Sequence, residues 1–241
     1  MQTEREKPHS RTTTLLIEFK GEEMPLYVTK DGSYYAPNLV PLKIESSSND
    51  QEQQDIPKSD KPEVELFIMT HCPYGTQAEK GILPAIEALG NTINSKIRFV
   101  HYFMHEPEET ETPIQVCIRE EQSEKYLNYL ECYLEDGDSD RCLTETGIDT
   151  SKMNTCLDNG KADEYYEIDS VLSENYGVQG SPTLVINGEI VSSSRDSASY
   201  LDTICSAFNE APEECMTELS SSSPSPGFGW EGTGSSTTAS C

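Results

Sequence analysis

Eight cysteines are spread over residues 72–241 of this 241-residue chain, and no two of them form a Cys-x-x-Cys pair. Most structural zinc sites use that doublet, so the spacing does not favour a metal centre. Well-separated cysteines in a domain of ordinary size instead predict disulfides, which persist in oxidising compartments. We therefore expect an extracytoplasmic protein, in a periplasm-like space, at a cell surface or secreted, although no signal peptide is visible in the sequence.

The charge of the chain excludes two classes of partner. It carries 43 acidic and 17 basic residues, which gives a formal net charge of −26. Such a surface offers no basic footprint for the phosphates of nucleic acids or anionic lipids. No apolar run approaches the ~20 residues of a membrane-spanning helix. We expect an acidic protein without a nucleic-acid partner and without a transmembrane segment in this chain.

Composition divides the chain into a main domain, a small β appendage before it, a linker and two polar ends. In the appendage, Asp31-Gly32 is a hairpin-turn signal between two β-type runs. The linker and the tail are rich in Ser and other polar residues, which cannot bury a core. The expected parts are residues 1–11 (disordered), 12–45 (β appendage), 46–62 (linker), 63–216 (main domain) and 217–241 (disordered tail).

The main domain alternates strand and helix patterns, which predicts an α/β fold. Residues 64–69 form a largely apolar run that fits a buried strand, and residues 97–104 predict a second strand. A helix should begin at Pro73 between them, because proline suits a first helical turn. One long helical stretch is expected over residues 114–134, followed by shorter helices over 150–159 and 162–176. A hairpin over 183–191 and a closing helix over 197–208 should complete the domain.

Cys72 lies where the first strand of this domain meets the following helix. The free amides and the partial positive charge of a helix N-terminus stabilise a thiolate. Such a position lowers a cysteine pKa from about 8.5 into the range of roughly 3.5–7.5. We therefore predict that Cys72 is a nucleophile, and that His71 beside it either stabilises the thiolate or caps the junction.

A second pattern lies about a hundred residues further on, where Gly180-Ser181-Pro182-Thr183 directly precedes the hairpin. A strand, Cys72-Pro73-Tyr74, a helix, a strand, a helical insertion and then this tetrapeptide together resemble the thioredoxin fold of the DsbA-like class. The resemblance implies a thiol–disulfide oxidoreductase without a cofactor, acting on protein or peptide disulfides with an unknown redox partner. It also implies that Pro182 is cis and faces Cys72, with Ser181 and Thr183 in support.

The resemblance narrows to the interferon-inducible lysosomal thiol reductases and their prokaryotic relatives. Residues 70–77, with the sequence Thr-His-Cys-Pro-Tyr-Gly-Thr-Gln, are similar to the prokaryotic group, and the cysteine layout follows the family over residues 63–216. One departure matters, because Gly75 replaces the usual second cysteine. A dithiol enzyme releases its trapped partner through that thiol. We expect a monothiol site, and Cys241 at the end of the tail is a candidate resolving cysteine.

Six cysteines remain for structural disulfides: Cys117, Cys132, Cys142, Cys156, Cys205 and Cys215. The last two close a short loop. Cys117 and Cys132 would lie about 22 Å apart on one straight helix at 1.5 Å per residue, too far apart to be bonded. Each should pair with Cys142 or Cys156, and we favour Cys132–Cys142 with Cys117–Cys156.

Two further interpretations compete with disulfide exchange. The domain could be a redox-silent module that binds peptides in the groove beside Pro182. A weaker alternative is a single-cysteine glutaredoxin with an iron–sulfur cluster, which the helical insertion and the extra disulfides disfavour. His105 and the acidic run after it could hold a metal, but a solvated loop is the simpler interpretation, and we expect no metal site.

Overall fold

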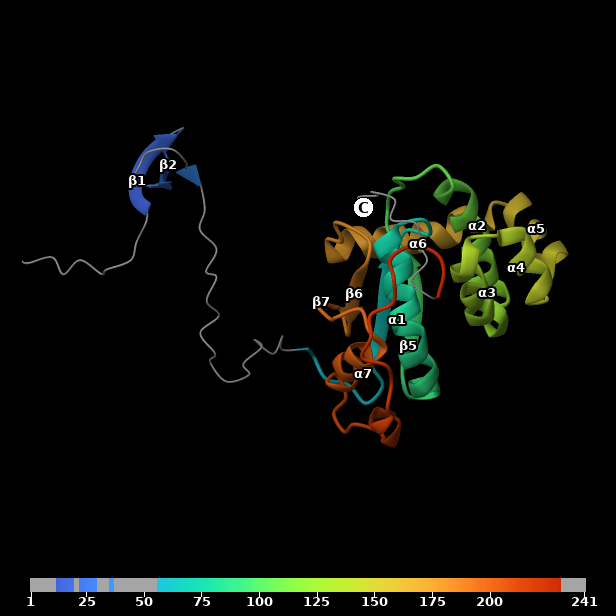
Figure 1. Ribbon diagram of the computed structural model, residues 1–241. Coiled ribbons are helices and arrows are strands. Elements are labelled where there is room, and N and C mark those ends of the chain that lie inside the picture. Colours follow the sequence, from blue (N-terminus) through green and yellow to red (C-terminus); the bar gives the residue numbers. More distant parts are fainter. Residues whose placement is uncertain (1–11, 20–21, 30–34, 37–55, 231–241) are drawn as a thin grey trace, which may run out of the picture. The chain divides into compact units, whose positions relative to one another are not determined.

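The computed structural model describes residues 12–19, 22–29, 35–36 and 56–230, and the chain forms two compact units, residues 1–52 and 53–241. The first unit is an antiparallel sheet in the order β1-β2-β3, as expected for a β appendage (Figure 1). Its strands are β1 (Thr12–Phe19), β2 (Glu22–Thr29) and β3 (Tyr35–Ala36). The turn predicted at Asp31-Gly32 and the predicted disordered segment 1–11 lie outside the described residues.

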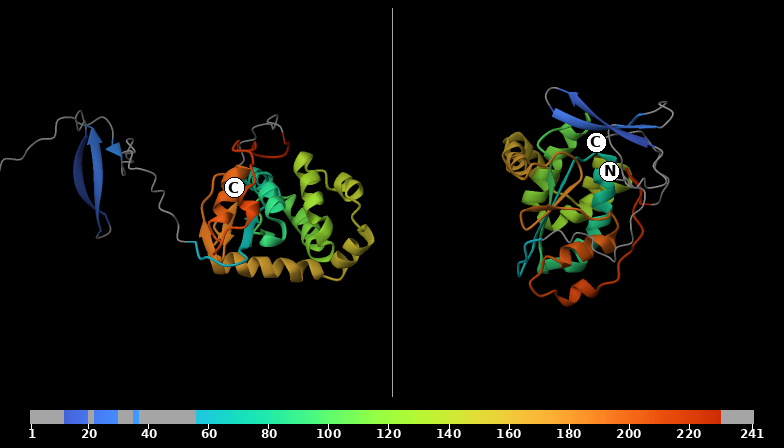
Figure 2. Two further views of the ribbon diagram at one scale, coloured as in Figure 1. Left: turned by 90° about the horizontal axis from the view of Figure 1, so that it is seen from below. Right: turned by 90° about the vertical axis from the view of Figure 1, so that its left-hand side faces the viewer.

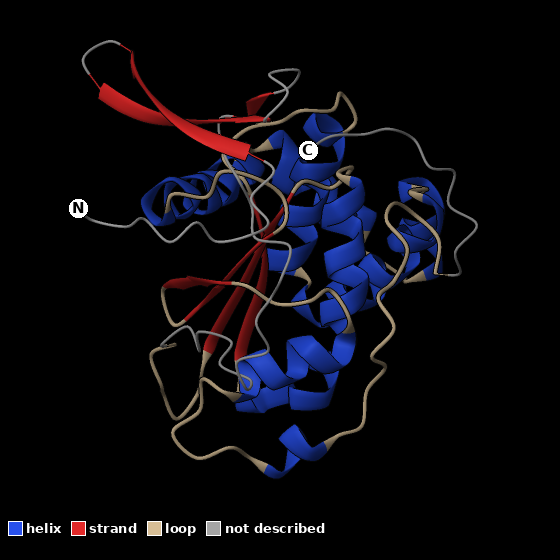
Figure 3. Ribbon diagram, turned by 60° about the vertical axis from the view of Figure 1, so that its left-hand side comes forward, coloured by secondary structure: helices blue, strands red, loops and turns tan. Residues whose placement is uncertain are grey.

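The second unit contains a four-stranded sheet in the order β5-β4-β6-β7, in which only β4 and β5 are parallel (Figure 3). Its strands are β4 (Glu63–Ile68), β5 (Asn94–Phe99), β6 (Thr183–Ile186) and β7 (Glu189–Val191). Its α-helices are α1 (Pro73–Leu89), α2 (Glu108–Glu121), α3 (Ser123–Asp136), α4 (Ser139–Glu145), α5 (Thr150–Asp158), α6 (Lys161–Tyr176) and α7 (Ser197–Cys205). Short 3-10 turns are Gly90–Thr92 and Glu213–Met216.

β4 is largely apolar, apart from Glu63 and Glu65, because residues 64–68 are buried between covered faces of the sheet. Val64, Leu66 and Ile68 belong to the main core, which also contains residues of α1 and α7. Phe67 and Met69 point to the other face and join a smaller cluster with Val residues of the strands and loops. None of the described helices combines the length and the apolar character that crossing a bilayer requires.

A buried ion pair holds α6 against the sheet. α6 runs across the domain from the group of helices α4 and α5 back to the sheet (Figure 2). Asp169 of α6 is completely buried and accepts hydrogen bonds from Arg119 of α2 (2.6 Å) and Arg98 of β5 (2.7 Å). It also accepts the backbone N–H of Phe99 at 3.2 Å. Asp169 therefore ties α2, α6 and β5 together at one point.

The helical insertion differs from the expected single long helix. It breaks at Gln122 into α2 and α3, and the amide of Gln122 exchanges two hydrogen bonds with the backbone of Asp149, at 2.8 and 3.1 Å. The sequence has no glycine at the break that would predict it. The helix breaks at Gln122 because of this contact with the distant Asp149. α4 was not expected from the sequence; the carboxylate of Asp138 caps it by accepting the N–H of Arg141.

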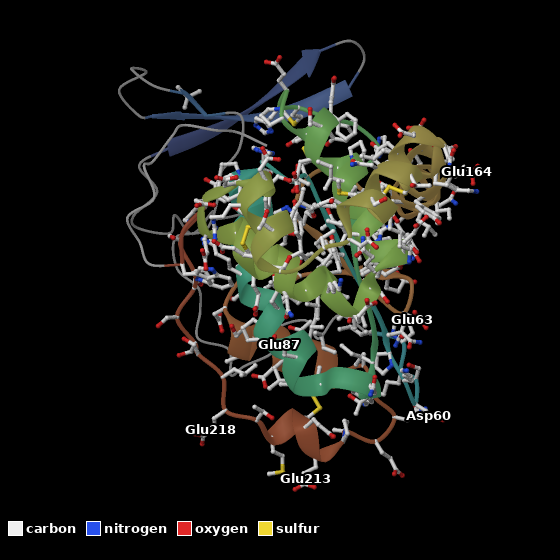
Figure 4. The ribbon with its side chains drawn as sticks, turned by 90° about the vertical axis from the view of Figure 1, so that its right-hand side faces the viewer. Asp60, Glu63, Glu87, Glu164, Glu213 and Glu218 are labelled. Atoms are coloured by element: carbon white, nitrogen blue, oxygen red, sulfur yellow. A yellow bond between two sulfur atoms is a disulfide. The ribbon has the colours of Figure 1, made fainter. Side chains whose placement is uncertain are left out.

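Three disulfides join the helices, and they match the favoured pairing: Cys117–Cys156, Cys132–Cys142 and Cys205–Cys215. Figure 4 shows disulfides as yellow bonds, together with exposed acidic side chains from several segments of the domain, among them Asp60, Glu63, Glu87, Glu164, Glu213 and Glu218. The first disulfide staples α2 to α5, which lie on either side of the break at Gln122. The disulfides Cys117–Cys156 and Cys132–Cys142 hold the helices of the insertion together. The labelled acidic side chains face solvent.

Residues 217–230 differ from the disordered tail that we expected. Gly227 donates its N–H to Pro73 at 2.9 Å, and Gly229 donates to Leu134 at 2.8 Å. Figure 1 shows this segment in red, running along α1. The sequence suggested disorder because Ser, Gly and Pro dominate; here their backbone polar groups are bonded to the domain. Residues 231–241 lie outside the described part of the chain.

We predict that Asp169→Ala lowers the free energy of unfolding by about 3–5 kcal/mol, because it removes the fully buried carboxylate that Arg98 and Arg119 share. Denaturant unfolding followed by circular dichroism measures the change. Asp163→Ala is the matched control, because Asp163 is an exposed aspartate of the same helix and should stay within about 0.5 kcal/mol of the wild type. Equal stability of the two variants would contradict the role of Asp169.

Candidate active site

Cys72 caps the N-terminus of α1. Its extended backbone conformation and its side chain both fit the cap position, and its sulfur accepts the N–H of Gly75 at 3.2 Å. The residue is completely buried, among Phe67, Val178 and Val185. In this structure Cys72 is disulfide-bonded. The donor at the helix end favours the thiolate whenever the sulfur is reduced.

The Ser181–Pro182 loop lies against this sulfur. The antiparallel pairing of β4 with β6 places Phe67 opposite Thr183, so the residues that follow β4 meet those that precede β6. The carbonyl oxygen of Ser181 is 3.3 Å from the Cys72 sulfur, although 109 residues separate them in sequence. The Ser181–Pro182 peptide bond is cis, as the resemblance implied. The two sequence patterns therefore form one site.

Ser181 also occupies the space next to Gly75. The Ser181 hydroxyl oxygen accepts the N–H of Met69 at 2.9 Å, which fixes its position. A β-carbon built on Gly75 would lie 2.6 Å from that oxygen and 3.0 Å from the carbonyl oxygen of Met69. A cysteine side chain therefore does not fit at position 75 without rearrangement. The absence of a second cysteine in the Cys-Pro-Tyr-Gly sequence is matched by the packing around it.

The ring of His71 lies among aromatic side chains of α3 and of the C-terminal segment. Its ring packs edge-on against Tyr133 and Phe228, with centroids 6.1 and 5.6 Å away. Burial lowers the pKa of His71 below 6.5, while the Glu108 carboxylate opposes this shift and His105 adds to it. The imidazole is therefore neutral at pH 7. Capping of the junction is done by Cys72 itself.

The remaining predicted residues lie next to Cys72 and Pro182 in the sequence. Pro73 opens α1, and the exposed ring of Tyr74 lies under the guanidinium of Arg195 at 5.0 Å. Thr183 donates its hydroxyl to the carbonyl of Gly180 at 2.8 Å, which closes the turn before β6. A cavity of about 260 Å³ adjoins Pro182 and reaches β7 and α7. Its lining includes Pro182, Thr183, Leu184, Ile190, Val191, Arg195 and Tyr200.

Two buried carboxyl groups lie beneath this region. Burial raises the pKa of Glu79 in α1 to about 8, with a further increase from the charge of Glu111. Burial also raises the pKa of Glu111 in α2 to about 7, against the lowering effect of hydrogen bonds from Gln115, Tyr129 and Ser139. The sequence suggested a solvated loop for the acidic run after His105, but Glu108 and Glu111 of that run are buried in α2. The carboxyl groups of Glu79 and Glu111 therefore keep their protons to much higher pH than an exposed glutamate does.

Lys80 and Phe228 were not predicted to contribute to this region. Lys80 is 1% exposed on α1, and Phe228 is the aromatic neighbour of His71 described above. The sequence does not show that a single lysine in an amphipathic helix is buried. It also does not show that an aromatic residue in a Gly-rich tail packs against the domain. No group of three His, Cys, Asp or Glu side chains in the described part of the chain could hold a metal ion. His105 instead pairs with Glu108 at 2.7 Å.

Comparison with known proteins assigns the domain to a family. A family model described as thioredoxin matches residues 58–205, which is more than half of the chain. In fold the chain is similar to reduced DsbA from Mycobacterium tuberculosis, with a TM-score of 0.51, 17% identity and coverage of 67% of this chain and 92% of that chain. BdbD from Bacillus subtilis (oxidised) gives a TM-score of 0.49, 17% identity and coverage of 64% and 91%. No curated protein matches the chain.

The family model and the Mycobacterium tuberculosis structure establish a thioredoxin-like fold for the main domain. The chain belongs to the thioredoxin family. The resemblance to DsbA-like proteins is confirmed at the level of the fold by the Mycobacterium tuberculosis structure. The narrower resemblance to the lysosomal thiol reductases stays a prediction.

We predict that Gly75→Ala lowers the free energy of unfolding by about 1–3 kcal/mol, because the added methyl group overpacks the contact with Ser181. Gly180→Ala is the control, since a β-carbon there meets nothing within 4 Å. Denaturant unfolding of both variants measures the difference. If Gly75→Ala proved no less stable than Gly180→Ala, the steric argument for the single cysteine would be wrong.

The raised pKa of Glu79 also predicts how stability depends on pH. Since the folded-state pKa of about 8 exceeds the ordinary 4.5, the folded chain holds a proton that the unfolded chain loses. This stabilisation is complete below about pH 4.5 and is lost as the pH rises towards 8. Glu79→Gln stays neutral, so its stability relative to wild type should rise by up to about 1.4 kcal/mol per pH unit across that window.

Urea unfolding of the wild type and of Glu79→Gln at several pH values measures this difference. Glu174→Gln is the control, because Glu174 is an exposed glutamate of α6. Its unfolding free energy should follow the wild type across the whole range. Parallel curves for wild type and Glu79→Gln would show that Glu79 is ionised in the folded protein.

Proposed function

We propose that the protein is a thiol–disulfide oxidoreductase that acts on protein or peptide disulfides through Cys72. The observation that carries the proposal is the meeting of the Cys72 sulfur with the Ser181 carbonyl, 3.3 Å apart and directly before cis-Pro182. Membership of the thioredoxin family supports it. The three structural disulfides support an oxidising, extracytoplasmic location.

The local chemistry is that of a monothiol site. A reduced Cys72 thiolate attacks a substrate disulfide, forms a mixed disulfide and releases one substrate thiolate. Gly75 cannot resolve that intermediate, and a side chain at this position would displace the Ser181 hydroxyl. We propose that Cys241 resolves the mixed disulfide or caps Cys72 as a resting disulfide. The three disulfides above account for the other six cysteines.

The complete burial of Cys72 sets a condition on this function. A substrate disulfide can reach the sulfur only when the site opens locally. Local opening of a small region costs less free energy than global unfolding. We therefore expect exchange to be slow in the closed, disulfide-bonded form and fast after reduction.

A redox-silent peptide-binding module is the competing function, and thiol reactivity separates the two. After mild reduction, Cys72 should be the most rapidly alkylated thiol, with an apparent pKa below the ordinary value of about 8.5. Rates measured against pH by mass spectrometry should lose this fast phase in Cys72→Ser. Cys241→Ser is the second variant; it should keep the fast phase and accumulate mixed disulfides with substrate.

Persistence of the fast phase in Cys72→Ser would place the reactive thiol elsewhere. An inert Cys72 with normal peptide binding would favour the redox-silent module.

A further inference from the structure

Residues 224–230, which we call the docking strip, are held by their backbone. The ammonium group of Lys80 donates to the carbonyl oxygens of Ser225, Gly227 and Gly229 at 2.6, 2.7 and 2.7 Å. One turn of α1 earlier, the Gln77 amide donates to the carbonyl of Pro224 at 2.7 Å. A single buried side chain therefore gathers three carbonyl groups of the strip.

The other side of the docking strip lies on α3. Gly229 donates its N–H to Leu134 at 2.8 Å, and the Trp230 indole donates to the carbonyl of Glu131 at 3.3 Å. The ring of Phe228 lies between the rings of His71 and Tyr133, with centroids 5.6 and 5.4 Å away. The strip thus occupies the seam between α1 and α3 beside the residue that precedes Cys72.

The Phe228 ring packs against Gly137, which has no side chain to obstruct it. It caps α3 in the left-handed conformation, with a φ of 78°. A β-carbon there would come within 2.9 Å of the Phe228 ring. The close approach of the aromatic ring therefore depends on the missing side chain at this position. The slot for Phe228 is a built feature of the α3 terminus.

The docking strip also supplies the hydrogen bonds that the buried ammonium group of Lys80 needs. A buried ammonium group costs free energy unless hydrogen bonds replace its hydration. The three strip carbonyls use all three donors of the group. Burial lowers the pKa of Lys80, and the neighbouring Glu79 opposes that shift. Lys80 is therefore buried at the cost of its hydration, and the docking strip compensates for it.

We propose that Lys80 and the Phe228 slot form a docking site for the chain's own C-terminal strip, and that docking positions Cys241 for reaction with Cys72. The inference rests on the proposed function. Gly227 bonds to Pro73, the residue next to Cys72. Cys241 is the eleventh residue after Trp230, and a segment of that length spans at most about 40 Å.

Docking changes the length of the effective tether. Without the strip contacts, the last attachment before it is Ser220, whose carbonyl accepts the N–H of Ala198 at 3.0 Å. The tether to Cys241 would then be 21 residues in place of 11. Effective concentration falls roughly as the −3/2 power of tether length, which gives about a 2.6-fold gain from docking through length alone. Lys80 is a positioning residue in this scheme.

The reaction that docking assists is balanced. Cys72 as thiolate attacks the substrate disulfide, so a Cys72–substrate bond forms and one substrate thiolate leaves. Cys241 as thiolate then attacks the Cys72 sulfur, a Cys72–Cys241 bond forms and the second substrate thiolate leaves. The substrate disulfide gains two electrons and two protons, and the two protein thiols are oxidised to one disulfide.

The test uses the full-length protein equilibrated in buffers of reduced and oxidised glutathione. Acid quenching and peptide mapping give the fractions of Cys72–Cys241 disulfide and of Cys72–glutathione adduct, and hence the effective concentration of Cys241. Lys80→Met and Phe228→Ala should each lower it about 2.6-fold, the change expected from the longer tether. Lys161→Met is the control, since Lys161 is an exposed lysine whose ammonium pairs with Glu164, and it should leave the value unchanged.

The possible outcomes distinguish failure of the docking proposal from failure of the proposed function. An effective concentration within 1.5-fold of wild type in Phe228→Ala, which alters only the strip, would overturn the docking proposal even if Lys80→Met failed to fold. A wild-type protein that forms the glutathione adduct on Cys72 and never the Cys72–Cys241 disulfide would also overturn it, while the proposed oxidoreductase activity would stand. A wild-type protein that forms neither would refute the proposed function itself.

Discussion

The register between β4 and β6 is the constraint on which the site depends. Pairing Phe67 with Thr183 forces the turn after β4 to meet the loop before β6, so Cys72 and Ser181 come into contact from distant parts of the sequence. The remaining elements keep that register in place. α1 and α7 cover one face of the sheet, and α6, fixed by Asp169, covers the other. A one-residue slip would turn every side chain of β6 to the wrong face.

The same contact explains why the site has a single cysteine. The Ser181 hydroxyl is fixed by the N–H of Met69 and fills the volume that a side chain at position 75 would need. The sulfur therefore has one helix-end donor near it and no thiol partner one turn along α1. A resolving thiol must come from elsewhere in the chain or from another molecule. In the sequence, the docked segment 224–230 precedes Cys241, the one cysteine of the chain besides Cys72 that is not part of the three disulfides.

Much of the fold follows from local patterns, and the exceptions have physical causes. The apolar run of β4, the helix after Cys72 and the hairpin at Asn187-Gly188 were predictable, because each depends on residues close in sequence. The break at Gln122 and the burial of Glu111 were not, since each is set by a contact with a distant segment. The docked tail belongs to the same class. Lys80 could be recognised as its partner only after both segments had been placed.

The central claim is that Cys72 alone begins disulfide exchange in this protein. Rapid-quench mass spectrometry of the mildly reduced chain, mixed with a peptide disulfide, tests it most directly. The account predicts that the first covalent adduct is on Cys72 and that it decays as a second disulfide involving Cys72 grows. A first adduct on any other cysteine, or no adduct under conditions that modify a small reference thiol, would contradict it.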